Sequence, residues 1–250
     1  KKEEQKNFFF SLFLDMDAAA VAAWYVDGSG LPKIVSYAHG KVAEDSWEAR
    51  VQVVDRLLSA AEDKAKVEHA ISKTVFGMPG VYLTPEGNIA SGIGPQLKKL
   101  TTVLELSAVG FVPLSQAIVF LFKKDEGVPP SIILIGCSGV KATLTIFRVG
   151  KMVGEQIIDI ADDPATEIEL ALKQYQESDV LPSRMLLYGG DESVLDVVRG
   201  KLLKHPWPTR ANFLHFPKIE IFSTEKLLSA VSLSGASELA AAIGDGDEGD

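Results

Sequence analysis

The chain has 250 residues, 46% of them hydrophobic and 24% charged, a composition typical of a soluble globular protein with one large or two modest domains. The formal net charge of −9 gives no broad positive field, so no nucleic-acid partner is predicted. One cysteine excludes an internal disulfide, and no histidine has a second ligand at metal spacing, so we predict a reducing compartment and no structural metal. The apolar run at 8–14 is cut by Asp15 and is too short to span a membrane, so neither a signal peptide nor a membrane span is predicted.

The first half of the chain is predicted to contain three strands followed by alternating helices and strands. Ser46 is an N-cap candidate, and apolar residues recur after it at helical spacing. The predicted strands lie at 8–14, 19–26, 31–39, 71–76 and 110–113, and the predicted helices at 46–61, 95–106 and 114–124. The order is βββαβαβα.

The same order begins again after a linker rich in proline and glycine at 127–130. The predicted strands lie at 131–135, 141–148, 151–158, 185–188 and 219–222, and the predicted helices at 164–176, 192–204 and 237–243. We therefore predict an α/β fold of two lobes, 1–126 and 127–243, with an acidic tail at 244–250.

This repeated unit resembles the ribonuclease-H-like fold, and two such units in tandem resemble the actin-like ATPase superfamily of actin, Hsp70 and sugar kinases. The pattern is most similar to that of the bacterial PilM and FtsA proteins. The resemblance implies an interlobe cleft. In this family, backbone N–H groups of the first hairpin of each lobe hold phosphates, and carboxylates organise magnesium. A loop of the second lobe holds adenosine.

The first phosphate hairpin corresponds to residues 15–20. Asp15 is retained and could hold magnesium through water, although it also fits a polar residue that ends a strand. Asp17 stands where the family has a glycine, and a carboxylate there would repel a phosphate. The first hairpin therefore matches the family only in part.

The second phosphate hairpin corresponds to residues 136–143. Gly136 replaces the aspartate that helps to position water and metal in phosphoryl transfer, so no catalytic residue is assigned. Four residues leave this loop able to contact or neutralise an anion, namely Ser138, Gly139, Lys141 and Thr143. The same residues fit a tight hairpin with an exposed lysine, and this alternative stays open.

The adenosine loop corresponds to Gly189 and Gly190, a glycine pair between a predicted strand and a predicted helix. This is the best preserved of the three signals. A glycine pair at such a turn is nevertheless common in α/β proteins, so its specificity is low.

Three functions fit these observations. The altered motifs favour a non-catalytic scaffold for a membrane-associated assembly such as a pilus or division complex, located in the cytoplasm or at the inner face of the membrane, with protein partners and scope for self-association. The second function is an active ATPase or small-molecule kinase of the same superfold, for which ATP and magnesium are the implied ligands. The third is an α/β interaction module without this fold. A role in assembly rests on analogy alone.

Overall fold

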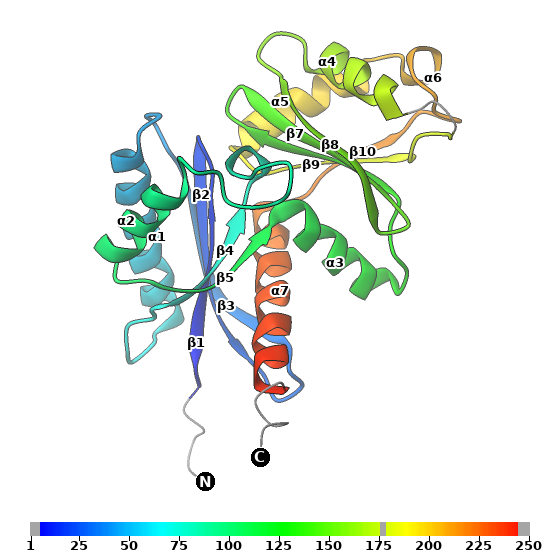
Figure 1. Ribbon diagram of the computed structural model, residues 1–250. Coiled ribbons are helices and arrows are strands. Elements are labelled where there is room, and N and C mark those ends of the chain that lie inside the picture. Colours follow the sequence, from blue (N-terminus) through cyan, green and yellow to red (C-terminus); the bar gives the residue numbers. More distant parts are fainter. Residues whose placement is uncertain (1–5, 176–178, 245–250) are drawn as a thin grey trace.

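The computed structural model describes residues 6–175 and 179–244, which form two five-stranded sheets with helices between and around them (Figure 1). The first half contains β1 (Phe8–Leu14), β2 (Ala18–Val26), β3 (Pro32–Lys41), α1 (Trp47–Ala65), β4 (Lys73–Met78), the 3₁₀ turn η1 (Gly80–Tyr82), α2 (Gly94–Val103), β5 (Ser107–Pro113) and α3 (Leu114–Glu126). The second half contains β6 (Ile132–Ser138), β7 (Lys141–Arg148), β8 (Lys151–Asp159), α4 (Pro164–Leu172), the 3₁₀ turn η2 (Lys173–Tyr175), β9 (Arg184–Tyr188), α5 (Glu192–Leu203), α6 (Trp207–Arg210), β10 (Lys218–Ile221) and α7 (Thr224–Gly244).

The two sheets have the same strand order. The first sheet is ordered β3-β2-β1-β4-β5, and the second, read in the same direction, is β8-β7-β6-β9-β10. In each sheet the first three strands are antiparallel, and the last two join in parallel. The repeated topology predicted from the sequence is confirmed.

The core has three layers of apolar side chains. Helices α1 and α2 cover the outer face of the first sheet, and α4 and α5 cover the outer face of the second. Strands β1 and β6 are central and buried on both faces, which explains why their sequences are continuous apolar runs. Between the sheets a third cluster contains residues of α3 and α7, which pack against each other.

Helix α7 differs most from its prediction. It begins at Thr224 rather than at 237, and it packs on all five strands of the first sheet. Its buried apolar face includes Leu228 and Val231, but serines interrupt the apolar periodicity, which hides the helix in the sequence. One of them, Ser232, lies 2.8 Å from the Ser11 hydroxyl of β1 inside the interface.

Gly235 and Gly77 let α7 approach the first sheet closely. A Cβ on Gly235 would lie 2.5 Å from Val75, and one on Gly77 would lie 2.8 Å from Val231. Helix α7 follows the second sheet in sequence but packs on the first. The limits of the two lobes, 1–126 and 127–243, remain a prediction. Of the predicted tail at 244–250, all but Gly244 lies outside the described residues.

Two other element limits were wrong. The first strand of the second half continues through Ser138, because Gly136 and Cys137 pair with Thr143 and Ala142 in the ladder. The helix predicted at 164–176 is α-helical only to Leu172 and then tightens into η2. No helix of the described chain combines the length and the hydropathy required to cross a bilayer.

Candidate functional site in the interlobe cleft

Three turns from the two sheets meet between the lobes. They are the β1–β2 turn at 15–17, the β6–β7 turn and the β9–α5 turn that contains Gly189 and Gly190. A Cβ on Gly190 would lie 2.9 Å from the Cys137 carbonyl oxygen and 3.4 Å from Asp17 Oδ1. Both glycines have a positive φ, +76° and +60°, which favours glycine. The glycine pair therefore lets the turn pass close to both hairpins.

Asp15 is buried at this junction, with 1% of its surface exposed. Its Oδ1 accepts a hydrogen bond from the Met16 backbone N–H at 2.7 Å. Burial raises the pKa of Asp15 to about 7, although the Ser138 hydroxyl and the Met16 N–H favour the ionised form. The carboxyl of the first lobe therefore faces the hairpin of the second and carries a charge that its surroundings poorly compensate.

Asp17 also reaches across the cleft. Burial raises its pKa, and the backbone N–H groups of Gly139 and Asp191 act in the opposite direction. Asp17 Oδ1 is buried and has no hydrogen-bond partner among the described residues. The Asp17 carboxyl thus lies between the β6–β7 turn and the start of α5, where backbone donors face it.

The second hairpin is narrower than the loop expected at 136–143. Only Gly139 and Val140 connect β6 to β7, and the positive φ of Gly139, +59°, is typical of a type II′ turn. A Cβ on Gly136 would lie 2.7 Å from Cζ and the hydroxyl of Tyr188. The ring of Tyr188 therefore leaves no room at position 136 for the aspartate of the family.

The remaining two residues of the second hairpin, Thr143 and Lys141, lie on β7 opposite Gly136 and Ser138. Thr143 packs against the first lobe, where a Cβ on Gly80 would lie 2.5 Å from Thr143 Oγ1, and that oxygen has no hydrogen-bond partner in the described chain. Lys141 is exposed. The structure thus brings together Asp15, Asp17, Ser138, Gly139, Gly189 and Gly190, but not Thr143 and Lys141.

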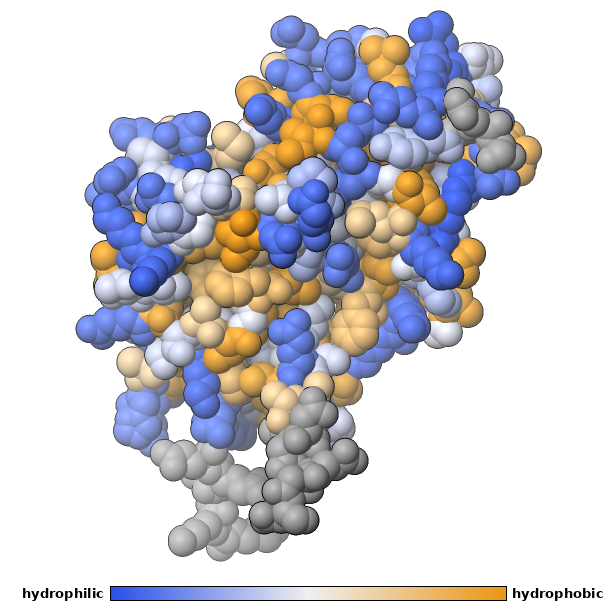
Figure 2. All heavy atoms as spheres, in the orientation of Figure 1, coloured by the Kyte–Doolittle hydropathy of each residue, from blue (hydrophilic) through white to orange (hydrophobic). Residues whose placement is uncertain are grey.

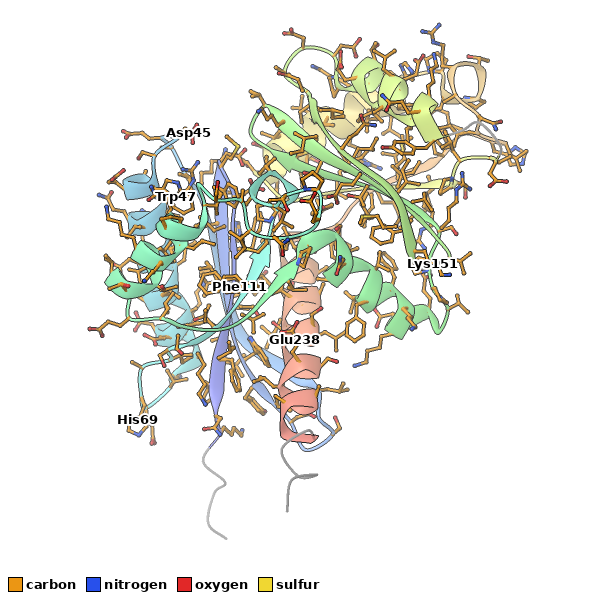
Figure 3. All side chains as sticks on the ribbon, in the orientation of Figure 1. Asp45, Trp47, His69, Phe111, Lys151 and Glu238 are labelled. Carbon is orange, nitrogen blue, oxygen red and sulfur yellow. The ribbon has the colours of Figure 1, made fainter. Side chains whose placement is uncertain are left out.

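Arg50 supports the first hairpin from α1. Its guanidinium is buried and donates to the carbonyl oxygens of Asp15 and Met16, each at 3.3 Å, and to Asp45 at 2.5 Å. Its side chain also lies over the ring of Trp47, next to Asp45 at the start of α1 (Figure 3). The arginine therefore holds the backbone of the turn, and its nearest carboxylate is Asp45 rather than Asp15.

Two residues that join the lobes, Lys41 and Asp191, were not predicted from the sequence. Lys41, the last residue of β3, forms an ion pair with Asp191, the N-cap of α5, and donates to Ser193 at 3.4 Å. A cavity of about 290 Å³ lies beside this pair, lined by both lobes and by Thr224 at the start of α7. No local signal marks Lys41, because its role follows from the packing of the two lobes.

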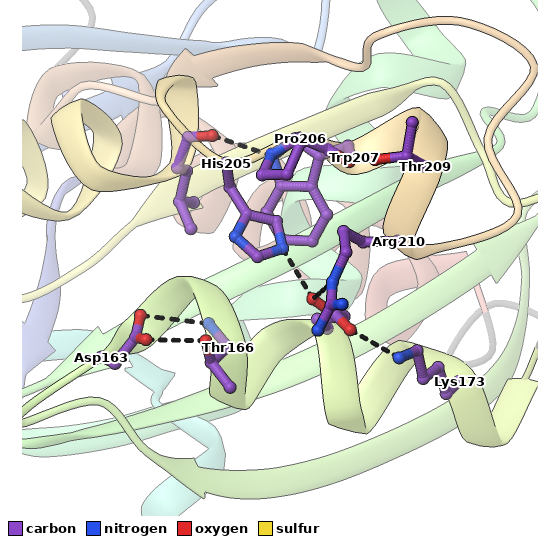
Figure 4. A network of polar contacts seen from close by, with 10 residues as sticks. Asp163, Thr166, Lys173, His205, Pro206, Trp207, Thr209 and Arg210 are labelled. Carbon is purple, nitrogen blue, oxygen red and sulfur yellow. Dashed lines mark hydrogen bonds and ion pairs between the residues drawn. The ribbon is translucent and has the colours of Figure 1, made fainter.

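A second buried carboxylate lies away from the cleft, in the second lobe. Glu169 of α4 is 1% exposed and contacts Lys173, His205 Nε2 at 2.8 Å and Arg210 Nε at 3.1 Å (Figure 4). Burial raises the pKa of Glu169, but hydrogen bonds from these three residues outweigh it and lower the pKa to about 2. His205 also packs on Trp207, with ring centroids 4.4 Å apart, so this network joins α4 to α6.

Solved structures with the same arrangement are found at low sequence identity. The PilM–PilN type IV pilus biogenesis complex matches with a TM-score of 0.59 at 11% identity, covering 91% of this chain and 97% of that chain. The ethanolamine utilization protein EutJ from Carboxydothermus hydrogenoformans gives 0.57 at 11% identity, covering 91% and 89%. The chain has the actin-like ATPase fold. The inorganic polyphosphate/ATP-glucomannokinase from Arthrobacter sp. strain KM gives 0.54 at 14% identity, covering 92% and 99%.

The actin-like fold confirms the predicted family resemblance and the two-lobed α/β architecture. The alternative of an α/β module without this fold is wrong. No protein-family model and no curated protein sequence matches the chain. The function must therefore be argued from the cleft and the surface of the molecule.

Proposed function

We propose that this actin-like chain is a non-catalytic scaffold in which the Asp17 carboxyl occupies the place of a nucleotide phosphate. In this proposal it holds protein partners of a membrane-associated assembly at the inner face of the membrane. One observation carries the proposal: the Asp17 carboxyl is buried beside the glycine pair, with Oδ1 3.4 Å from a Cβ placed on Gly190. The backbone N–H groups of Gly139 and Asp191 lower its pKa, and such N–H groups are the donors that a nucleotide phosphate would need.

ATP and magnesium fit these residues poorly. A phosphate next to the Asp17 carboxylate would be repelled. The two cations nearest the cleft among the described residues are already paired, Lys41 with Asp191 and Arg50 with Asp45. The ring of Tyr188 lies over Gly136, where the family has its second aspartate. We therefore derive no phosphoryl-transfer step for this cleft.

The structural neighbours are compatible with this proposal. One is PilM in a type IV pilus biogenesis complex with PilN, which supports a role in holding protein partners. Another is a glucomannokinase, which keeps the alternative of an active ATPase or small-molecule kinase open to experiment.

A thermal melt with and without ATP and magnesium tests the proposal, because a ligand that binds only the folded state raises the Tm. We expect no shift for the wild type and an upward shift for Asp17→Gly, which restores the glycine of the family. Asp17→Asn is the matched control, since it removes the charge and keeps the volume, and its shift should be smaller than that of Asp17→Gly.

A clear shift of the wild-type Tm would overturn the proposal. Formation of ADP from ATP by the wild type, alone or with a sugar acceptor, that is lost in the double variant Asp15→Asn, Asp17→Asn would instead establish the ATPase or kinase alternative.

A further inference from the structure

A second cavity lies far from the cleft along α7. It is a groove of about 560 Å³ between α3, the C-terminal part of α7 and the β7–β8 hairpin. The cleft contacts α7 at Thr224 and the groove contacts it from Ser234 to Glu238, so at least ten residues, or roughly 15 Å along the helix, separate the two. The groove is therefore separate from the nucleotide cleft.

The rim of the groove is apolar and exposed. Among the residues that line it, Phe120 is 39%, Met152 46% and Val149 67% exposed. Apolar exposure continues beyond the cavity at Val128 and Val153, and Figure 2 shows apolar side chains gathered across the middle of this face. Single exposed apolar residues are ordinary, but a cluster around a groove marks an interaction site.

Val149 occupies a backbone conformation that disfavours valine. It has a φ of +49° and is followed by Gly150 at +73°, so the β7–β8 turn has the type I′ form, in which asparagine and glycine are favoured. A β-branched side chain in this region is strained. The chain thus keeps a strained and exposed valine at the tip of the hairpin, where it faces the groove.

Glu238 contributes the carboxylate of the groove. Its Oε2 would lie 2.5 Å from a Cβ on Gly110, so the carboxyl rests against β5 next to a bulge in the β4–β5 pairing. Figure 3 shows Glu238 on α7 beside Phe111 of β5, with Lys151 on the hairpin at the other side. Partial burial raises the pKa of Glu238, and it forms no ion pair in the described chain. Lys123 of α3 is the one cation among the described lining residues.

We propose that this groove docks an apolar peptide segment of a partner protein, and that a lysine or arginine of that segment pairs with Glu238. Val149 and Phe120 contact the apolar side chains of the peptide, and Met152 adapts to their shape. The Glu238 carboxylate, which forms no ion pair in the described chain, is the group that recognises this basic residue. The proposal rests on the scaffold function above, since it gives that scaffold a surface for a partner.

Selection from a random dodecapeptide display library against the full chain supplies the probe. We expect the enriched peptides to combine spaced apolar residues with a lysine or arginine. In fluorescence anisotropy, a synthetic selected peptide should bind Glu238→Gln and Phe120→Ala at least fivefold more weakly than the wild type. Glu225→Gln, on the same helix but outside the groove, and Phe216→Ala, a similarly exposed phenylalanine, should bind as the wild type does.

The variant Val149→Asn distinguishes an effect on peptide binding from an effect on stability. Asparagine suits the turn, so the Tm should rise by about 2–4 °C while the affinity for the peptide falls at least fivefold. Val140→Asn, in the turn of the other hairpin of the same sheet, should leave the affinity unchanged.

Three outcomes would overturn the proposal: no enriched peptide, enriched peptides without a basic residue, or equal affinity for the wild type and the groove variants. A wild-type dimer in sedimentation velocity that is lost in Glu238→Gln would also overturn it, in favour of a second copy of the chain. Nucleotide melts report on the cleft and peptide binding reports on the groove, so either proposal can fail alone.

Discussion

Asp15 in the cleft and Glu169 in the second lobe are two carboxyl groups with the same low exposure and opposite electrostatics. Each is 1% exposed. Glu169 contacts a lysine, a histidine and an arginine, which hold its pKa at about 2, whereas burial raises the pKa of Asp15 to about 7. Both the partners and the depth differ, because Glu169 is covered by the partly exposed side chains that pair with it, whereas Asp15 lies deep between the two sheets.

The surroundings of Glu169 stabilise its ionised form, whereas those of Asp15 disfavour ionisation. The network around Glu169 satisfies the charge and joins two helices of one lobe. The Asp15 and Asp17 carboxyls instead face the opposite lobe and form no ion pair in the described chain. The charge of Asp17 raises the pKa of Asp15, and that of Asp191 raises the pKa of Asp17. Carboxyls in such surroundings are typical of a site that has, or once had, a ligand.

The largest expected effect is that of Asp15→Asn. Because the folded-state pKa, about 7, lies above the unfolded value of 3.8, the contribution of Asp15 to stability is complete below about pH 3.8 and is lost as the pH rises through 7. The variant should therefore match the wild type near pH 4 and exceed its free energy of unfolding at pH 8 by up to about 4 kcal/mol. Urea denaturation across this pH range measures the difference.

Asp55→Asn is the control for this experiment, since Asp55 is an exposed residue of α1. Its difference from the wild type should stay nearly constant with pH. An Asp15→Asn variant that is less stable than the wild type at pH 8 would show that the cleft compensates the charge of Asp15 after all.

Glu169→Gln should lower the free energy of unfolding at neutral pH, and by less than Asp15→Asn raises it. The folded-state pKa, about 2, lies below the unfolded value of 4.5, so the contribution of Glu169 is present above about pH 4.5 and is lost as the pH falls toward 2. At pH 7 the variant should lose about 2 kcal/mol, since Lys173 and Arg210 are partly exposed and solvent screens their charges. The same denaturation series measures this loss, and Glu167→Gln, on the same helix, is the matched control. Equal stability of Glu169→Gln and the wild type at pH 7 would contradict the assignment.

The two carboxyls also differ in how far the sequence predicts them. Asp15 stands at the end of a repeated apolar strand, and strand periodicity with the family resemblance was enough to place it in a cleft with Asp17 and the glycine pair. Nothing in the sequence around Glu169 predicts its partners, because Arg210 of the short helix α6 and His205 just before that helix lie about forty residues away. Contacts of this kind depend on tertiary packing, which local patterns do not encode.

The same limit explains what was missed in the fold. The strands follow from continuous or alternating apolar runs, and most were predicted within a few residues. The predicted helix at 237–243 was too short because serines break the apolar pattern of α7. The packing of α7 on the first sheet depends on Gly77 and Gly235, and that role can be recognised only once the helix and the sheet are in contact. Tyr188 over Gly136 is a further contact across two strands that no spacing rule predicts.

The smallest expected effect concerns Lys41, the cation that reaches the cleft but pairs with Asp191 rather than with Asp15 or Asp17. Burial raises the pKa of Asp191, and the Lys41 ammonium with the Ser193 donors outweighs it and holds that pKa low. Lys41→Met should therefore raise the pKa of Asp191. It should change the free energy of unfolding by less than about 1 kcal/mol, because Lys41 is largely exposed. NMR titration of the Asp191 carboxyl carbon measures the shift.

Lys33→Met, on the same strand, removes an equal charge far from Asp191 along β3 and should leave that titration unchanged. If both variants move the Asp191 titration equally, the net charge of the chain and not the contact across the lobes sets the pKa. If only Lys41→Met moves it, the ion pair is formed in solution and the lobes are held together at this point. Lys41 would then hold the cleft closed and would not be available to bind a nucleotide phosphate. The carboxylates of the cleft would also repel such a phosphate.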